Sequence, residues 1–389
     1  MRPLQPTGEQ EELRGAVRAV LARHPGHTAW APLTAQIGAA ALAVPEEYGG
    51  LGCGPAEVGV VMAELGRALS PVPYLGSAVL TVAALLASGD REACAKHLPH
   101  LAEGTAVGAL AWAETPAGAG PRAGGGSGTG AGSGGPRGSW EAHELTARAE
   151  PAGSGWVLTG TKRYVLAGPA EPTLLLAFAR TAPAPGTARG PGAEPGQGRL
   201  GLFELLAAPA AFTVRSTMDR TRPLAELTLD RTPARLLSAD GAGVLARVRD
   251  LACTALAAEQ AGAAARALEV TVRYAKERVQ FGRPIGSFQA VKHRLADLHT
   301  AVEGARSLAL AAAAADAAPD LAAAAKSACS EAYAYVAGEM IQLHGGIGIT
   351  WEHEAHEYFK RAHGSARLFG SPAAHRERLA GRLGFLPTG

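Results

Sequence analysis

The stretch Arg278–Gln289, RVQFGRPIGSFQ, decides how the C-terminal part of this chain folds. Apolar residues that run into this stretch and others that follow it repeat at the spacing i, i+4, i+7 and i+11, which is typical of one face of an α-helix. Gly282, Pro284 and Gly286 interrupt the pattern between the two sets. The sequence therefore predicts two antiparallel helices joined by a turn. The first set is Leu268, Val272, Ala275 and Val279, and the second is Val291, Leu295, Leu298 and Val302.

The whole region 236–389 has this helical character. Alanine fills much of 309–336, where small side chains let helices approach closely. The pair Pro319-Asp320 is typical of the first turn of a helix, because proline is tolerated there. Several such helices bury their apolar faces most economically in a four-helix bundle.

A second helical region is predicted at 1–103. Between its helices, residues 44–52 read VPEEYGGLG, and the glycines permit the positive φ angles of a tight turn. Apolar residues lie on two helical stripes: Leu13, Val17, Val20 and Leu21, and then Val60, Met62, Leu65 and Leu69.

Residues 104–235 change to short runs of β-favouring residues bounded by Gly and Pro, for example Gly155–Leu166 and Thr173–Phe178. Insertions rich in Gly, Pro and Ala at Ala117–Gly138 and Thr181–Gly198 are predicted to be mobile surface loops. The first insertion contains Gly-x-Gly spacings but lacks the flanking strand and helix of a dinucleotide-binding loop. We therefore expect an α+β multidomain fold: a helical domain, a small β-barrel-like domain and a helical bundle.

Composition limits the partners and the compartment. The 389 residues include 37 Lys plus Arg and 35 Asp plus Glu, so a net charge of +2 gives no field that favours nucleic acid or an anionic membrane. The four cysteines form no C-x-x-C pair, and no run of about 20 apolar residues indicates a membrane span. We expect a cytoplasmic protein without membrane insertion.

Two segments together carry a resemblance to a known family. RVQFGRPIGSFQ at 278–289 and QLHGGIG at 342–348 resemble the flavin-binding signature of acyl-CoA dehydrogenases. The order of helical, β and helical regions is also the arrangement of that family. The resemblance implies FAD as cofactor, an acyl-CoA thioester as substrate, an electron-transfer acceptor, a role in lipid metabolism, and a homo- or hetero-oligomer.

The resemblance also implies which residues bind the cofactor. Arg278 matches an arginine that contacts the flavin diphosphate, which a guanidinium can bind through two hydrogen bonds. The alternative interpretation of Arg278 is a solvated arginine that stabilises the C-terminal end of a helix. The remaining matched positions are Gln280, Phe281 and Gln289 near the diphosphate and adenosine, Gln342, Gly345 and Gly346 toward a neighbouring subunit's cofactor, and Tyr164 as an aromatic platform for the ring.

The positions of the family's catalytic glutamate do not hold an acid. One position falls on Phe369 and the alternative position falls on Ala252. Asp250 is the nearest candidate base, and Glu259 is a weaker one, about two turns further along the same helix. The catalytic residue is therefore unknown from the sequence.

Three further segments depart from the family pattern. Its Thr-Glu-Pro segment becomes Ala113-Glu114-Thr115-Pro116, its Trp-Ile-Thr segment becomes Tyr164-Val165-Leu166, and its Arg-Asp pair becomes Lys360-Arg361. His353 and His356 are three residues apart rather than the four of a zinc-protease motif, so we expect no metal site.

Four functions are compatible with these residues. The first is an FAD-dependent acyl-CoA dehydrogenase that oxidises an acyl thioester, with activity that can depend on a partner subunit. The second is a catalytically silent subunit that completes the flavin site of a related chain. The others are a flavin-dependent oxygenase on the same scaffold, and an acyl-CoA binding module without enzymatic activity.

Overall fold

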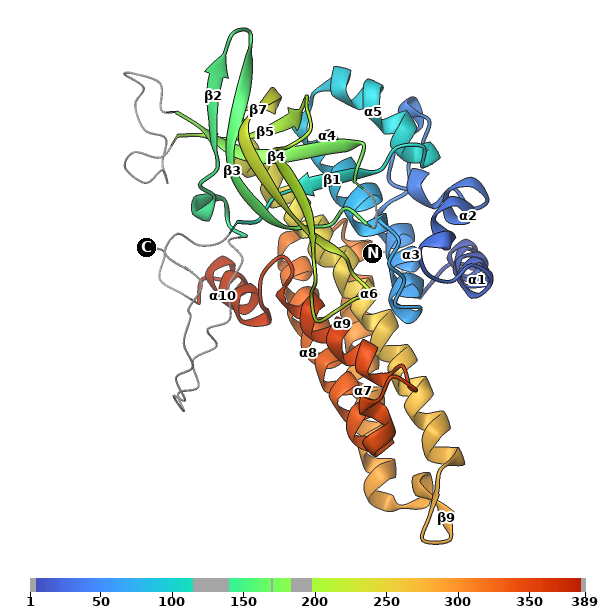
Figure 1. Ribbon diagram of the computed structural model, residues 1–389. Coiled ribbons are helices and arrows are strands. Elements are labelled where there is room, and N and C mark those ends of the chain that lie inside the picture. The colour runs from blue at the N-terminus through green and yellow to red at the C-terminus, as the bar shows by residue number, and fades with distance from the viewer. Residues whose placement is uncertain (1–4, 115–139, 169–170, 183–197, 386–389) are drawn as a thin grey trace.

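The computed structural model describes residues 5–114, 140–168, 171–182 and 198–385. It confirms the predicted order of a helical region, a small closed sheet and a helical bundle (Figure 1). The first Gly/Pro-rich insertion, Ala117–Gly138, with its Gly-x-Gly spacings, lies wholly outside the described residues. The second, Thr181–Gly198, lies outside them except for Thr181, Ala182 and Gly198. Within the described residues, no helix is long and apolar enough to cross a membrane.

The N-terminal region begins at a capping box, in which Thr7 Oγ1 accepts a hydrogen bond from the Gln10 amide at 3.2 Å. Val17 and Val20 are buried as the helical stripe predicts. The glycines of the 44–52 turn have positive φ at Gly49 and Gly52. The helices are α1 (Gly8–Arg23), α2 (Trp30–Ala35), α3 (Pro55–Arg67), a π-helical turn η4 (Leu75–Thr81), α4 (Val82–Ser88) and α5 (Arg91–Glu103).

The middle region is a sheet in the order β1-β4-β2-β3-β7-β5, which closes because β4 also pairs with β5. Strand β6 pairs with β7 outside this path. Leu158, Phe203 and Leu227 are fully buried inside it. The strands are β1 (Gly108–Ala111), β2 (Arg148–Ala152), β3 (Gly155–Val165), β4 (Leu174–Thr181), β5 (Leu200–Leu205), β6 (Ala211–Arg215) and β7 (Leu224–Ser238).

The C-terminal region is built on the long helix α6, which packs against α3 and α4 as well as against α7 and α8. Glycines permit the close contact of α3 with α6. A Cβ on Gly262 would lie 2.1 Å from the Ala63 carbonyl oxygen, and a Cβ on Gly66 would lie 2.1 Å from the Glu259 carbonyl oxygen. The helices are α6 (Gly241–Glu277), α7 (Gln289–Ala314), α8 (Pro319–His344), α9 (Ala355–Arg367) and α10 (Pro372–Arg382).

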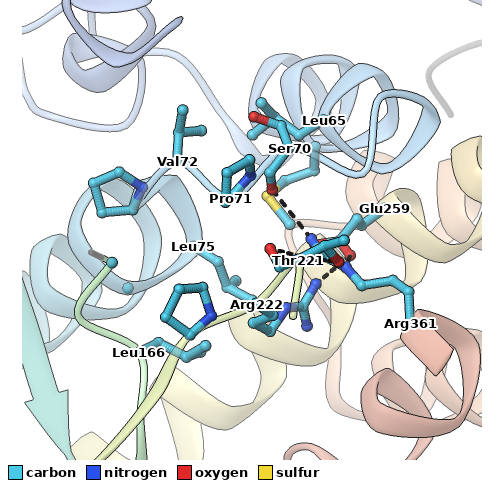
Figure 2. A pocket seen from close by; sticks show the side chains of 15 residues that line it. Leu65, Ser70, Pro71, Val72, Leu75, Leu166, Thr221, Arg222, Glu259 and Arg361 are labelled. Carbon is cyan, nitrogen blue, oxygen red and sulfur yellow. Dashed lines mark hydrogen bonds and ion pairs between the residues drawn. The ribbon is translucent and has the colours of Figure 1, made fainter. Parts of the chain in front are cut away.

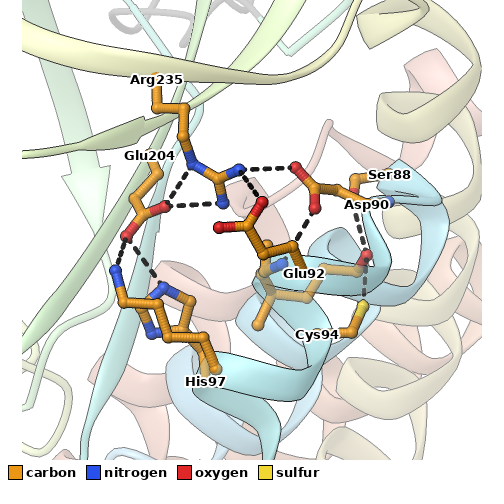
Figure 3. Close-up of polar contacts among 10 residues, drawn as sticks. Ser88, Asp90, Glu92, Cys94, His97, Glu204 and Arg235 are labelled. Carbon is orange, nitrogen blue, oxygen red and sulfur yellow. Dashed lines mark hydrogen bonds and ion pairs between the residues drawn. The ribbon is translucent and has the colours of Figure 1, made fainter.

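A buried carboxylate joins the sheet to the N-terminal helices (Figure 3). Glu204 on β5 accepts hydrogen bonds from His97 at 2.8 Å and Lys96 at 3.0 Å, both on α5, and from Arg235 on β7 at 3.2 Å. Arg235 also binds Asp90 at 3.0 Å. The hydrogen bond from His97, opposed by burial and reinforced by Lys96 and Arg235, lowers the pKa of Glu204 to about 2.

Glu204→Gln is expected to make stability less sensitive to acid. The pKa of Glu204 is about 2 in the folded chain and 4.5 in the unfolded chain, so its stabilisation is complete above 4.5 and is lost as the pH falls toward 2. The variant should lose about 2 to 3 kcal/mol near neutral pH. Urea unfolding of native chain and variant at a series of pH values from neutral pH down toward pH 2 measures this loss. Glu150→Gln, in an exposed pair with Arg231, is the control. Parallel pH profiles for native chain and Glu204→Gln would contradict the assignment.

Candidate functional site

The segment predicted to bind the flavin diphosphate forms a β-hairpin at the end of α6. Strands β8 (Val279–Gln280) and β9 (Arg283–Pro284) pair, and the two residues between them, Phe281 and Gly282, both have positive φ, as a type I′ turn requires. Arg278 caps α6 and is exposed, and within the described residues no carboxylate lies within 4 Å of its guanidinium. Gln280, Phe281 and Gln289 are also exposed. Arg278, Gln280 and Gln289 thus present side-chain donors to an anionic ligand, and the Gln280 amide also donates to the Val279 carbonyl at 2.9 Å.

The paired-glycine segment lies at the same end of the bundle. The Tyr274 hydroxyl, one turn before Arg278, donates to the His344 carbonyl at 3.3 Å, and the two rings stack at 4.3 Å. Gly345 and Gly346 follow directly, exposed, with nothing within 4 Å of where a Cβ would stand. Gln342 is exposed on the last turn of α8. Bare glycine backbone of this kind can approach phosphate oxygens.

Phe369, which the resemblance places at the usual base position, is buried in a cluster of aromatic rings. Its ring stacks on Trp112 at 5.4 Å and meets the edge of Trp140 at 5.4 Å. Trp140 in turn stacks on Tyr164 at 5.8 Å, so Tyr164 contacts the chain's own indole. We call Trp112, Trp140, Tyr164 and Phe369 the aromatic cluster. Through it, Phe369 and Tyr164, which the resemblance places near the flavin ring, are joined by the chain's own indoles.

Polar groups hold the turn that carries Phe369. Phe369 has φ of 61°, a conformation that costs a non-glycine residue free energy unless its surroundings enforce it. His375 Nε2 donates to the Phe369 carbonyl at 3.0 Å, and Lys326 Nζ donates to the carbonyls of Ala366 and Gly370, each at 3.3 Å. Burial lowers the pKa of Lys326 to about 8 and that of His375 to about 3. The backbone of this turn is therefore fixed from two helices, α8 and α10.

The other base position offers no acid either. Ala252 is fully buried on α6. Asp250 is also buried, and its carboxylate accepts a hydrogen bond from Arg378 of α10, with Arg249 Nε 3.7 Å away. The carboxylate that the sequence suggested as a base, Asp250, is therefore held in an ion pair inside the protein.

Glu259 is enclosed by two arginines (Figure 2). Arg222, which precedes β7, and Arg361 of α9, at 3.0 Å, both bind its carboxylate. Burial alone would raise the pKa of Glu259, but the two guanidiniums outweigh it and hold the pKa below its usual value. Arg361 also donates to the Thr221 carbonyl at 2.8 Å. The replacement of the family's Arg-Asp pair by Lys360-Arg361 therefore places a cation opposite Glu259. We call Arg222, Glu259 and Arg361 the ion triad.

The cavity beside the ion triad is small. It measures about 30 Å³ between η4, the end of β3 and the segment before β7. A cavity of this size has room for only a few water molecules. Residues Pro73, Leu166 and Pro223 line it together with the triad. It does not hold an acyl chain in this conformation.

Other retained motif residues have structural partners. Glu114, kept from the Thr-Glu-Pro segment, pairs with the fully buried Lys162 and accepts from the Thr146 amide at 2.7 Å. His353 accepts from the Ala355 amide at 3.1 Å, and His356 contacts Lys360 at 3.2 Å. Within the described residues, no group of three His, Cys, Asp or Glu side chains could hold a metal ion.

Sequence reasoning missed the arginines and tryptophans that surround these positions. Arg222, Arg378, Trp112 and Trp140 belong to no motif. One signal was available, because Glu259 stands within an alanine-rich run of α6 and a buried carboxylate there requires a cationic partner.

Comparison with known proteins places the chain in a family. The model of the acyl-CoA dehydrogenase N-terminal domain matches residues 7–105, and that of the C-terminal domain matches 240–384. Acyl-CoA dehydrogenase IpdE2 of Mycobacterium tuberculosis is 37% identical over 391 residues, which cover 97% of this chain and 98% of that protein. This chain belongs to the acyl-CoA dehydrogenase family, whose members are flavoprotein oxidoreductases of lipid metabolism.

Two solved structures resemble the whole chain. A variant of the Tcur3481-Tcur3483 steroid ACAD has a TM-score of 0.77 at 30% identity, covering 97% of this chain and 98% of that chain. The ChsE4-ChsE5 complex from Mycobacterium tuberculosis has a TM-score of 0.80 at 26% identity, covering 99% and 100%. Each of these names combines two chain names, Tcur3481 with Tcur3483 and ChsE4 with ChsE5.

Proposed function

We propose that this chain is the base-lacking subunit of a heteromeric, FAD-dependent acyl-CoA dehydrogenase. One observation carries the proposal: at both base positions the chain has a buried apolar side chain, and the nearest acids, Asp250 and Glu259, are bound by arginines. Removing the α-proton of an acyl thioester requires a placed base. A partner subunit with a carboxylate at the position of Phe369 would supply it.

The chain's own contribution is to the phosphate end of the cofactor. Arg278, Gln280 and Gln289 present exposed donors beside the hairpin turn at Phe281, and the bare backbone of Gly345-Gly346 follows the exposed Gln342 at the same end of the bundle. These residues would hold the diphosphate and adenosine at a junction with the partner subunit. The ring end does not fit equally well, since the aromatic cluster fills that side of this chain.

The proposed reaction balances between the two subunits. The α C–H bond of the thioester breaks and its proton goes to the partner's carboxylate, while the β C–H bond breaks as a hydride. Bound FAD supplies the acceptor for that hydride. The products are an α,β-unsaturated thioester and reduced cofactor, which an electron-transfer acceptor protein reoxidises.

The relatives support a pair of unlike chains. The ChsE4-ChsE5 complex and the Tcur3481-Tcur3483 steroid ACAD each combine two chains, and this chain matches each over nearly its full length. A steroid-like acyl-CoA is therefore the first substrate to test.

The purified chain is expected to oxidise acyl-CoA at least about 100-fold more slowly alone than with a partner, because general base catalysis contributes about that much or more. The partner to co-express is an acyl-CoA dehydrogenase-like chain of the same organism with glutamate at the position matched by Phe369. The measurement is reduction of an artificial electron acceptor by steroid-like, medium and short acyl-CoAs. Rapid bleaching of the flavin by the isolated chain would refute the proposal.

The complex with the co-expressed partner also tests which residues hold the cofactor. Arg278→Ala should weaken flavin retention by about 1.5 to 3 kcal/mol, the value of a charge-assisted hydrogen bond. Arg273→Ala, an exposed arginine on the same helix, is the matched control. Flavin retained equally by both variants, measured as cofactor absorbance after dialysis, would make Arg278 a simple helix cap.

A further inference from the structure

Lys326 on α8 is a fully buried lysine without an acidic partner. None of its surface is exposed, and within the described residues no carboxylate lies within 4 Å of its ammonium group. Three oxygens bind the ammonium instead: the Ser330 hydroxyl at 3.0 Å and the carbonyls of Ala366 and Gly370, each at 3.3 Å. A lysine has three N–H donors, so every donor has an acceptor. A buried charge held in this way fixes its acceptors, because losing one would leave a donor unsatisfied.

The two carbonyls belong to the end of α9 and to the turn that follows it, and both α9 and α10 pack against α8 (Figure 1). Ala366 lies in the last turn of α9, where the helix dipole favours a cation. Phe369 and Gly370 both have positive φ, of 61° and 109°. Lys326 binds the Gly370 carbonyl and His375 binds the Phe369 carbonyl, so buried side chains hold both of these residues.

Packing an aromatic ring does not require a buried charge. The contacts of Phe369 with Trp112 and Trp140 are enough to bury its ring. Directional hydrogen bonds to the backbone do something that ring packing does not do, since they set the direction of the Cα–Cβ bond at position 369. The network also reaches α6, because the Ser330 hydroxyl accepts from Gln260 at 3.0 Å. The orientation of the turn is therefore tied to the long helix of the bundle.

We propose that Lys326 is a positioning residue that fixes the direction of the side chain at position 369 and aims it at Trp112 and Trp140. It acts through the backbone of the turn. The inference rests on the proposed function, in which position 369 is where a partner subunit carries its base. A carboxyl group at 369 would then be packed against two indoles, and burial would raise its pKa toward neutral pH, as a general base requires. This chain lacks the base but retains the means of aiming one.

Two groups beside the turn keep a constant charge over a wide pH range. The pKa of Lys326 is about 8 and that of His375 is about 3, both lowered mainly by burial, so between these values Lys326 is charged and His375 is neutral. Burial also raises the pKa of Cys253 to about 11. The other charged or titratable groups that face them are Arg222, Arg249, Asp250, Cys329, Arg367 and Arg378, with Tyr164 across the aromatic cluster.

Tryptophan fluorescence of Phe369→Glu, titrated against the uncharged reference Phe369→Gln, measures the pKa of the introduced carboxyl group. We expect a midpoint of about 6, as found for a carboxyl group packed against a tryptophan, rather than the value of about 4.3 for an exposed glutamate. Adding Lys326→Met should lower the midpoint toward about 4.3, because the released turn lets the carboxyl group reach water. Removing the positive charge alone would raise the midpoint, so the direction of the shift separates positioning from charge.

Met340→Ala is the matched control. Met340 is also fully buried on α8 but packs in a separate cluster with Tyr333 and Val336, so its truncation should destabilise the chain without moving the midpoint. The proposal is wrong if Phe369→Glu alone titrates at about 4.3, if Lys326→Met leaves the midpoint unchanged or raises it, or if Met340→Ala shifts it equally.

A second measurement does not require a charge at position 369. In chains that keep Phe369, the near-ultraviolet circular dichroism that Trp140→Phe removes is the signal of the aromatic cluster. Lys326→Met should lose at least about half of that signal, while Met340→Ala should keep it. Equal signals in these two variants would contradict the positioning role. Neither measurement uses flavin, acyl-CoA or a partner subunit, so a failure here is distinguishable from a failure of the proposed function.

Discussion

Phe369→Ala is expected to lower the free energy of unfolding by about 3 to 5 kcal/mol, the usual effect of truncating a buried phenylalanine. Only 2% of Phe369 is exposed, and its ring packs between Trp112 and Trp140. Alanine would leave a cavity between two indoles and would keep the positive φ that the turn imposes. Urea unfolding followed by fluorescence measures the loss, because the two tryptophans report on the cluster directly.

The chain offers a matched control for this change. Phe281 is 92% exposed at the tip of the hairpin, so Phe281→Ala should alter stability by less than about 0.5 kcal/mol. If the Phe369 variant unfolds too readily to measure, Phe369→Leu retains more volume and should show a smaller loss of the same sign. Equal stability of Phe369→Ala and Phe281→Ala would show that the aromatic cluster does not hold the turn.

Arg361→Met is expected to cost about 3 kcal/mol. The substitution removes one partner of a buried carboxylate, and breaking such a pair costs about 3 to 5 kcal/mol. We expect the lower end of that range because Arg222 still binds Glu259. The variant also loses the hydrogen bond from Arg361 to the Thr221 carbonyl. Chemical unfolding at neutral pH gives the value.

A surface pair provides the comparison for Arg361. Arg231 and Glu150 are 3.2 Å apart with side chains 64% and 54% exposed, and pairs of this kind contribute about 0 to 1 kcal/mol. Arg231→Met should therefore be nearly neutral. A loss in Arg361→Met no larger than that in Arg231→Met would mean that Glu259 does not depend on the ion triad.

Local patterns in the sequence predicted the architecture well. The 3.6-residue periodicity on both sides of Gly282 and Gly286 predicted α6, α7 and their turn, because a helix repeats its buried face every few residues. Short β-favouring runs predicted the closed sheet. The proposed replacement of the catalytic acid by Phe369 could be predicted by counting along the chain, since it needs only the distance from the paired glycines.

The surroundings of that replacement could not be predicted in the same way. Trp140 lies between Phe369 and Tyr164, three residues from three separate parts of the chain. Arg361 and Glu259 are 102 residues apart, and nothing periodic links them. Asp250 stood out from the sequence as a possible base, yet Arg378 on α10 binds it. Partners of this kind depend on how helices and sheet pack, which local spacing does not encode.

The amino-acid order alone determined the succession of helical and β regions and the family signature, and it predicted that Phe369 and Ala252 replace the family's catalytic carboxylate. Only the three-dimensional packing decided that arginines bind the neighbouring acids Asp250 and Glu259 and that Trp112, Trp140 and Tyr164 gather around Phe369. The reason is physical: helices and turns follow from nearest neighbours along the chain, whereas the charge and accessibility of a side chain are set by the groups that burial places around it.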